Sequence, residues 1–315
     1  MTSLLVILCS HNPRPDFLGA TLDALRRQSL HPSAWDFLIV DNASSTPVEA
    51  KVDISWHPHA RVVQEPALGP ARARHRALTE ARNLEADLIL FVDDDNVLAP
   101  DYLVRGLEVS LAWPQLGAWG GQLLPRFECP PAPWMERYFN LLAVMPLAAD
   151  RWTNHFSSYD AMPPTAGCFV RGAVWRRYLE LVEQEPLHLT LSRGEDMDLA
   201  LSAIDLGLGV GRLRVLRLEH LIPAARLTPA YVEGLVEGTV FGTDLLEYIR
   251  FRRLPKKNAR GWVDRALLAW RTWRLPEPAR TFRRAELRGR ARAQHTIGRW
   301  LAEKYAAGRP ASATS

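Results

Sequence analysis

The first hundred residues alternate short hydrophobic runs with polar or amphipathic segments. Residues 3–9, 35–40 and 88–92 are mostly apolar runs of five to seven residues, each followed by a polar turn. Runs of that length are too short for helices and predict strands buried on both faces, as in a parallel sheet. A weaker strand is predicted at residues 61–64. Because amphipathic segments predict helices between these strands, the pattern indicates a doubly wound α/β sheet.

The middle of the chain shows the same kinds of segment with less regular spacing. The apolar runs predict further strands at residues 118–124, 165–170 and 210–218. Amphipathic or aromatic segments predict helices at residues 102–112, 134–144, 173–183 and 195–205.

The last part of the chain differs from the rest in charge. Residues 250–309 hold 18 Lys or Arg against 4 Asp or Glu, whereas residues 1–249 hold 21 against 31. The acidic body argues against a nucleic-acid enzyme with a long basic cleft, so we expect no nucleic-acid partner. The basic tail favours an anionic surface as its partner.

Within this tail, residues 261–275 predict an amphipathic helix. Helical spacing gathers Trp262, Trp270 and Trp273 on one side and places Arg265 and Arg271 on the other. This arrangement fits a helix lying in an anionic membrane interface, with residues 250–310 as the contact. Packing of the tryptophans on the acidic body or in a dimer is equally compatible with the pattern.

Composition narrows the class of protein further. A chain of 315 residues, 47% of them hydrophobic, can bury a core and fits one large or two small domains. Cys9, Cys129 and Cys168 are odd in number and far apart, which favours buried thiols in a reducing compartment over a zinc site or disulfides. The apolar stretch at the N-terminus lacks a basic region before it, and no run approaches a membrane span. We therefore expect a cytoplasmic protein, with peripheral contact at the inner membrane face left open.

Three consecutive acids, Asp93, Asp94 and Asp95, follow the strand at residues 88–92. They stand at its carboxyl end, where open α/β sheets bind their ligands. Their mutual repulsion is best relieved by a cation, and a site rich in oxygen suits Mg²⁺ or Mn²⁺. A solvated acidic loop before the helix near Pro100 is the alternative.

Other acids and a histidine occupy corresponding positions after other predicted strands. Asp41, the pair Glu195 and Asp196, and His220 all stand at such ends, which a parallel sheet brings to one edge. His220 could complete the metal site or merely cap a turn. Glu195, Asp196 and Asp198 lie in the first turn of a predicted helix, where acids are favoured by the helix dipole. A carboxylate across a cleft from a metal could also act as a general base.

Taken together, six segments resemble family 2 glycosyltransferases in order and spacing, over about residues 3–222. The segments are residues 4–12, Val40-Asp41-Asn42 with Ser44, Gly69 through Ala73-Arg74, residues 91–95, Thr165-Ala166-Gly167, and residues 194–199. The resemblance implies a GT-A fold, a doubly wound, Rossmann-like mixed sheet, here with a helical C-terminal extension. It also implies an inverting transferase that moves a sugar from a nucleotide diphosphate to an acceptor hydroxyl.

The resemblance also implies roles for individual residues. Nucleotide contacts fall on Ser10, Asn12, Asp41, Arg74, Asp93 and Asp94, with Asp41 at the base, Asp93 near the ribose and no specific role for Asp94. Asp95 matches the acid that binds the metal, and His220 the further metal contact of some members. Asp196 matches the catalytic base, with Glu195 beside it in the catalytic set. The cofactor implied is Mn²⁺ or Mg²⁺, and the partners are a nucleotide-sugar donor, with UDP favoured, and a glycan or lipid-linked acceptor.

Departures from the family limit these expectations. The processive synthases carry a Gln-x-x-Arg-Trp motif, whereas here Gln294 stands at the wrong spacing from Arg299-Trp300. We therefore expect one sugar transferred per encounter, in glycan or polysaccharide biosynthesis. The turn after the first strand has His11 where many relatives have an aromatic residue before the Asn.

Two other functions remain open at this stage. A sugar-phosphate nucleotidylyltransferase would want a glycine-rich basic loop after the first strand, and residues 10–15 offer one arginine and no glycine. A catalytically inactive nucleotide-sugar-binding module would tolerate loss of the acids, yet both acid clusters are present. The expected division of the chain is a nucleotide-sugar-binding half at residues 1–115, an acceptor-binding half at 116–225 and a basic helical extension at 226–315.

Overall fold

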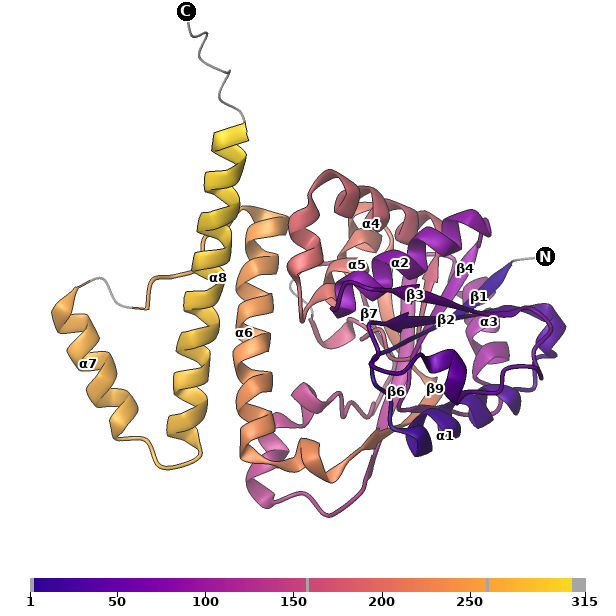
Figure 1. The fold of residues 1–315 in the computed structure, drawn as a ribbon, viewed down its shortest axis with the longest axis horizontal. Helices are drawn as coiled ribbons and strands as arrows, with labels where there is room; N and C mark the ends of the chain where they lie inside the picture. The colour runs from indigo at the N-terminus through magenta and orange to yellow at the C-terminus, as the bar shows by residue number, and fades with distance from the viewer. Residues whose placement is uncertain (1–2, 157–158, 259–260, 308–315) are drawn as a thin grey trace, which may run out of the picture. The chain divides into compact units, whose positions relative to one another are not determined.

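The computed structural model describes residues 3–156, 159–258 and 261–307. Its internal contacts divide the chain into two compact units. The first, Met1–Thr190 with Glu195–Leu227, contains the sheet and its covering helices. The second, Leu191–Gly194 with Thr228–Ser315, contains the long C-terminal helices (Figure 1).

Within the described residues, a nine-stranded mixed sheet forms the centre of the first unit. Its strands are β1 (Leu4–Ser10), β2 (Asp36–Asn42), β3 (Ala60–Glu65), β4 (Leu88–Asp93), β5 (Asn96–Leu98), β6 (Leu116–Phe127), β7 (Arg151–Thr153), β8 (Cys168–Arg171) and β9 (Gly209–Ile222). Their order is β3-β2-β1-β4-β8-β6-β9-β5, with β7 paired to β9. The strands β3, β2, β1 and β4 are parallel, whereas β8 runs antiparallel to β4. The expected doubly wound mixed sheet is confirmed.

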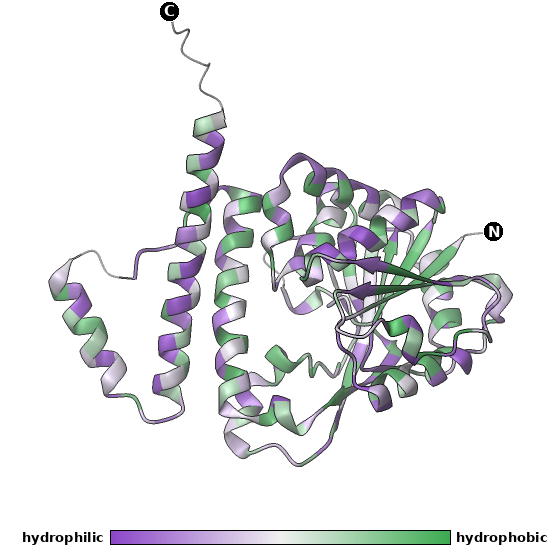
Figure 2. Ribbon diagram, viewed as in Figure 1, coloured by the Kyte–Doolittle hydropathy of each residue, from purple (hydrophilic) through white to green (hydrophobic). Residues whose placement is uncertain are grey.

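Helices cover both faces of this sheet. They are α1 (Pro15–Arg26), α2 (Pro70–Asn83), α3 (Tyr102–Ala112), α4 (Gly172–Gln184) and α5 (Glu195–Asp205). Successive side chains of a strand point to opposite faces. Val6 and Leu8 of β1 therefore share a buried cluster with Leu22 of α1 and Leu103 of α3. The other face is covered by α2, which contacts β1, β2 and α4, while α4 in turn contacts α5. Figure 2 shows the apolar character of the strands between these layers.

Among the differences between the expected and the observed elements, three concern the candidate site or the type of helix. The strand expected at residues 165–170 begins only at Cys168, because Gly167 turns the chain with φ +70° and lies against the Tyr102 hydroxyl. Residues 133–142 form a 3-10 helix rather than an α-helix. His220 lies inside β9 and not at its end, because pairing with β6 extends β9 to Ile222.

The cysteines of the chain are free, as expected, but they are not all buried. Cys168 is buried and Cys9 is largely enclosed, whereas Cys129 is exposed. The expectation of three buried thiols was therefore wrong for Cys129, which lies in the irregular segment after β6.

The second unit is a helical assembly with extensive charge pairing. Its helices are α6 (Pro229–Phe251), α7 (Trp262–Trp273) and α8 (Ala279–Ala307). Along α6 and α8, Arg288 donates to both Glu237 (2.7 Å) and Glu233 (2.6 Å), and Phe241 and Ile297 are buried. These two helices therefore pack through apolar contacts flanked by ion pairs. Among the described helices, none combines the length and apolar character that a membrane-spanning segment requires.

Candidate functional site

The carboxyl ends of β1, β2 and β4 bring several of the expected site residues to one edge of the sheet. In the strand register Ser10 is paired with Asp41, and Cys9 is paired with Asp93. These three strands are parallel neighbours, so the residues that follow them leave the sheet side by side. This convergence is what the strand pattern predicted for a ligand site.

Within the loop after β4, Asp94 is held by a residue of β1. The Ser10 hydroxyl donates to Asp94 Oδ2 at 2.5 Å. Burial and the neighbouring carboxylates Asp95 and Asp93 raise the pKa of Asp94 to about 7, although the bond from Ser10 lowers it. Burial likewise raises the pKa of Asp93, against the positive charge of Arg74. The two acids are therefore partly buried, in surroundings where added negative charge is costly.

Asp95 has the most strongly cationic surroundings of the three acids. Its Oδ2 accepts a hydrogen bond from Arg226 Nη1 at 2.8 Å and lies 3.4 Å from His220 Nε2. Burial alone would raise the pKa of Asp95, but His220 and Arg226 together hold it below its usual value. Asp95 is therefore ionised, as a metal ligand has to be.

The pair formed by Asp95 and His220 fits a divalent cation chemically. A carboxylate oxygen and an imidazole nitrogen face each other at 3.4 Å, and both side chains are buried. His220 Nδ1 is buried without a hydrogen-bond partner in the described part of the protein, so the ring is not anchored from its other side. Over the same residues, no group of three or more His, Cys, Asp or Glu is arranged to hold a metal ion. An ion there would take its remaining ligands from water and a diphosphate, as Mg²⁺ commonly does.

The loops after β1 and β2 are tied together by Asn12 and Asp41. Asn12, with φ 47°, accepts hydrogen bonds at Oδ1 from the amide and the hydroxyl of Ser45, both at 2.9 Å. Asp41 accepts from the amides of Ser44 and Val48 at 3.2 and 3.0 Å. Both oxygens of Asp41 thus already support the loop. A carboxylate has further lone pairs, through which Asp41 could still accept from a nucleotide base.

Arg74 links α2 to the beginning of α5. Its guanidinium is buried and donates to Glu195 Oε1 and, at 2.5 Å, to Thr165 Oγ1. The second Glu195 oxygen is buried and unpartnered among the described residues. Arg74 therefore neutralises Glu195 and fixes the start of α5 against the turn before β8.

The three acids at the start of α5 have different surroundings. Glu195 pairs with Arg74, and Asp198 lies 2.5 Å from His188 Nδ1, both of them buried. Asp196 accepts only from the amide of Met197, at 2.8 Å, within the described residues. Burial and the charge of Glu195 raise the pKa of Asp196 to about 6, even though Arg74 lowers it. A carboxyl with that pKa can be deprotonated near neutral pH and still accept a proton readily.

Sequence reasoning missed Arg226 and His188. Both are the cationic or imidazole partners of acids that the sequence did single out, and neither belongs to a motif. Arg226 is 131 residues from Asp95 in the chain. The one available signal was the position of Arg226 six residues after His220, as the single charged residue of the short segment that follows the last strand.

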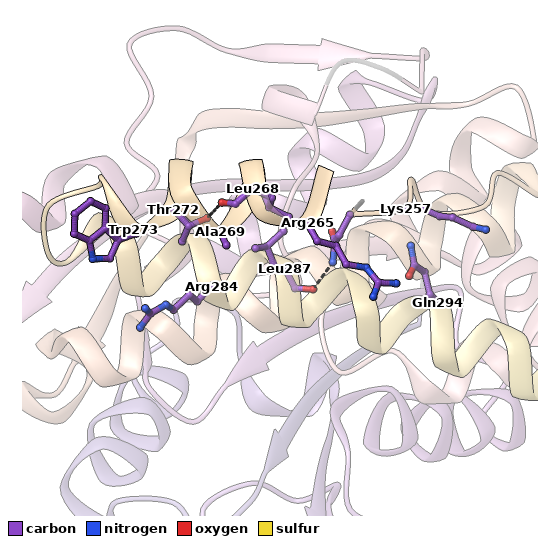
Figure 3. Close-up of a pocket in the computed structure, with 10 residues that line it drawn as sticks. Lys257, Arg265, Leu268, Ala269, Thr272, Trp273, Arg284, Leu287 and Gln294 are labelled. Atoms are coloured by element: carbon purple, nitrogen blue, oxygen red, sulfur yellow. Dashed lines mark hydrogen bonds between the residues drawn. The ribbon is translucent and has the colours of Figure 1, made fainter. Parts of the chain in front are cut away.

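A separate groove lies in the second unit, between α7 and α8 (Figure 3). It encloses about 590 Å³ and is lined by Lys257, Asn258, Arg265, Leu268, Ala269, Thr272, Trp273, Arg284, Leu287 and Gln294. Figure 3 shows Arg265, Lys257 and Gln294 toward one end and Arg284 with Trp273 toward the other. Among the described residues, the three cationic members form no ion pair. The groove is therefore basic with an apolar floor.

The sheet and helix arrangement is that of GT-A glycosyltransferases. A crystal structure of S. aureus TarS, residues 1–349, matches with a TM-score of 0.50 and 14% identity, covering 98% of this chain and 92% of that one. The same protein in complex with UDP-GlcNAc matches with a TM-score of 0.51 and 12% identity, covering 95% and 92%. A mannosyltransferase of Pyrobaculum calidifontis has a TM-score of 0.48 and 19% identity, covering 98% and 76%. At these identities the likeness to TarS concerns the fold alone.

The sequence is also similar to a family model. Residues 5–155 match the family model described as glycosyl transferase family 2. The match covers just under half of the chain and supports a glycosyltransferase enzyme. Among curated proteins, none matches its sequence.

Proposed function

We propose that this protein is an inverting, metal-dependent glycosyltransferase that moves a single sugar from a nucleotide diphosphate sugar to an acceptor hydroxyl. The observation that carries the proposal is the state of Asp196. Arg74 neutralises Glu195 and His188 engages Asp198, which leaves Asp196 as the acid in the first turn of α5 without a direct cationic contact among the described residues. Its pKa of about 6 suits a group that takes a proton from a hydroxyl.

In the proposed reaction Asp196 removes the proton from the acceptor hydroxyl as that oxygen attacks the sugar. Glu195 does not compete for this role because Arg74 holds it, so we assign Glu195 to positioning. The negative charge of Glu195 nevertheless favours the protonated form of Asp196 and makes it a stronger base. Attack on the face opposite the leaving diphosphate inverts the configuration at the sugar carbon.

The donor lies, on this proposal, at the edge formed by β1, β2 and β4. Asp41 would accept from the nucleotide base, Ser10 and Asn12 would line the nucleoside, and Asp93 would contact the ribose. Asp94 would contact the donor and would also hold the loop through its hydrogen bond with Ser10. A divalent Mn²⁺ or Mg²⁺ held by Asp95 and His220 would stabilise negative charge on the leaving diphosphate.

We assign residues 1–115 to donor binding and residues 116–225 to the acceptor, in glycan or polysaccharide biosynthesis. Uracil, thymine and guanine all offer an N–H from which Asp41 could accept a hydrogen bond, and among them we favour UDP. The complexes of TarS with UDP and with UDP-GlcNAc support that choice only through a shared fold. Nucleotidyl transfer is disfavoured because Arg14, the arginine after β1, pairs with Asp16 and Glu128.

A thermal-shift panel tests this assignment. The purified full chain is incubated with UDP-, GDP- and dTDP-sugars, each with and without Mn²⁺, beside the Asp95→Asn variant. A ligand at one hundred times its Kd stabilises a protein by about 2.7 kcal/mol, which is a readily measured shift. We expect a shift with UDP-sugars that needs Mn²⁺ in the wild type and is lost in the variant. Equal shifts with and without the metal would contradict the metal-dependent part.

We also propose a cytoplasmic location with peripheral contact to anionic membrane through residues 250–310. The exposed fractions of Trp262, Trp270 and Trp273 on α7 are 81%, 51% and 66%. Indole rings on one side of the helix suit the membrane interface. The cations of the groove (Figure 3), which form no ion pair among the described residues, suit anionic headgroups. This surface would hold the enzyme near a lipid-linked acceptor.

Liposome flotation tests the membrane contact. Trp262→Ser with Trp270→Ser should abolish flotation with vesicles containing phosphatidylglycerol, because both substitutions remove exposed anchoring rings. Leu111→Ser is the matched control, since Leu111 of α3 is 80% exposed in the first unit. Equal flotation of the tryptophan variant and the control would contradict the proposal, as would flotation with pure phosphatidylcholine.

A further inference from the structure

Arg226 lies next to the two residues of the proposed metal site. Arg226 belongs to the short 3-10 helix η6 (Ala224–Leu227), which follows β9 and precedes the second unit in the chain. Its Nη1 lies 2.8 Å from Asp95 Oδ2 and 3.4 Å from His220 Nε2. The guanidinium therefore contacts both side chains that would hold a divalent ion.

The contact joins a partly exposed cation to a buried anion. The side chain of Asp95 is 6% exposed and that of Arg226 is 33% exposed. A charge-assisted bond to a carboxylate with little access to water is stronger than a surface ion pair. Asp95 without a cation would be a buried uncompensated charge, so the site holds a positive group before any ion arrives.

A guanidinium and a divalent ion exclude each other at this position. Arginine stays protonated at every relevant pH, so it cannot become a metal ligand or lose its charge to make room. Two cations sharing Asp95 Oδ2 would repel each other strongly in a site of low dielectric constant. An ion that reaches Asp95 and His220 must therefore replace the contact with Arg226.

We propose that Arg226 is the resident counter-cation of Asp95, and that a divalent ion binds only by displacing it. The inference rests on the proposed metal site and concerns how that site is filled. Only the displaced state accepts the ion. The apparent affinity for metal therefore equals the affinity of the displaced state multiplied by the fraction of molecules in that state. Arg226 thus determines how tightly the enzyme holds a metal in the absence of donor.

The donor supplies the displaced guanidinium with a new partner. Guanidinium groups bind phosphate oxygens through two parallel hydrogen bonds, which a nucleotide diphosphate offers and free solvent does not. Metal and nucleotide diphosphate should consequently bind with positive cooperativity, and the coupling is reciprocal. Removing the guanidinium should tighten metal binding alone and weaken the coupling.

Mn²⁺ titration followed by the electron paramagnetic resonance signal of the free ion tests this inference without any activity readout. In the absence of nucleotide, Arg226→Gln should bind Mn²⁺ about tenfold more tightly, as expected if the wild type is displaced one time in ten. Arg126→Gln is the matched control, because Arg126 pairs with Glu219 next to His220 but does not touch Asp95. It should change the affinity less than twofold. Arg226→Lys keeps a cation and should bind Mn²⁺ more weakly than Arg226→Gln.

Repeating the titration with saturating UDP measures the coupling. UDP should tighten Mn²⁺ binding more in the wild type than in Arg226→Gln. Unchanged or weaker Mn²⁺ binding by a folded Arg226→Gln protein would overturn the inference. If Asp95→Asn loses Mn²⁺ binding in the same experiment, the proposed metal site still stands. If Asp95→Asn binds Mn²⁺ like the wild type, the metal site itself is wrong and the inference falls with it.

Discussion

The acids after β4 and the acids at the start of α5 look alike in the sequence, with three carboxylates within four positions in each case. In the structure the two groups of acids have different neighbours. After β4, the most buried acid, Asp95, is in contact with Arg226 and His220, and its pKa is lowered. On α5, Asp196 has no cation in direct contact among the described residues, and its pKa is raised to about 6.

The difference separates two kinds of chemistry. A carboxylate held ionised among cationic groups is suited to exchange one cation for another, which is what a metal ligand does. A carboxylate without a direct cationic contact and near another acid is suited to take up a proton. Each cluster also contains acids that hold the structure, as Asp198 does with His188. Acidity in the sequence therefore does not distinguish a metal ligand, a base and a structural anchor; the neighbours do.

The largest expected effect comes from removing the base. Asp196→Asn should lower the rate of sugar transfer by about 10²–10⁴-fold, because proton removal by a positioned group contributes that much. Binding of UDP, measured by calorimetry, should change little, since Asp196 is assigned to the acceptor. Glu180→Gln on α4, an exposed partner of Arg177, serves as the control. A variant that transfers sugar at a rate comparable to the wild type would refute the assignment of the base.

Removing the metal ligand should affect the other cluster alone. Asp95→Asn should weaken Mn²⁺-dependent UDP binding by more than about tenfold, the lower end of what even an outer-shell partner costs. Its UDP binding in the presence of a chelator should match that of the wild type. A loss of the same size with and without Mn²⁺ would assign Asp95 to the nucleotide instead.

An effect on stability rather than on activity separates the structural acid from the base. Asp198→Ala should destabilise the fold by about 3 kcal/mol, because it leaves the buried His188 without its partner.

Asp196→Asn should instead stabilise the fold at pH 8. The folded pKa of Asp196 is raised to about 6, so its contribution is greatest below the unfolded pKa and is lost as the pH rises through 6.

Thermal unfolding at two pH values checks the sign of that difference. The gain in Tm of Asp196→Asn over the wild type, worth about 3 kcal/mol at most, should be present at pH 8 and vanish near pH 4. A gain of equal size at both pH values would mean that the ionisation of Asp196 is not its cause.

Much of the fold could be predicted from the sequence because its determinants are local. The buried runs that became β1, β2 and β4 are continuous apolar segments, and α3 begins and ends where its pattern does. The end of β9 was harder to place, because alternating polar residues such as Arg217 and Glu219 are in a strand only through pairing with β6. Strand pairing of that kind depends on residues distant in the chain.

The acids of the candidate site could be predicted from the sequence, whereas the residues that pair with them could not. Asp95 and Asp196 stand in recognisable local contexts, at the end of a strand and in the first turn of a helix. Arg226 and His188 stand in segments with no such context, and each acts only through a three-dimensional contact. Whether an acid is free or already neutralised is therefore settled by tertiary structure.

The pH dependence of the transfer rate tests the central assignment most directly. The measurement uses the wild-type protein with saturating donor and Mn²⁺, and follows release of the nucleotide diphosphate from pH 4.5 to 8. With Asp196 as the base and its pKa near 6, the rate should rise about tenfold per pH unit below 6 and level off above it. A rate that is constant between pH 4.5 and 8 would contradict a base of that pKa and with it the role of Asp196.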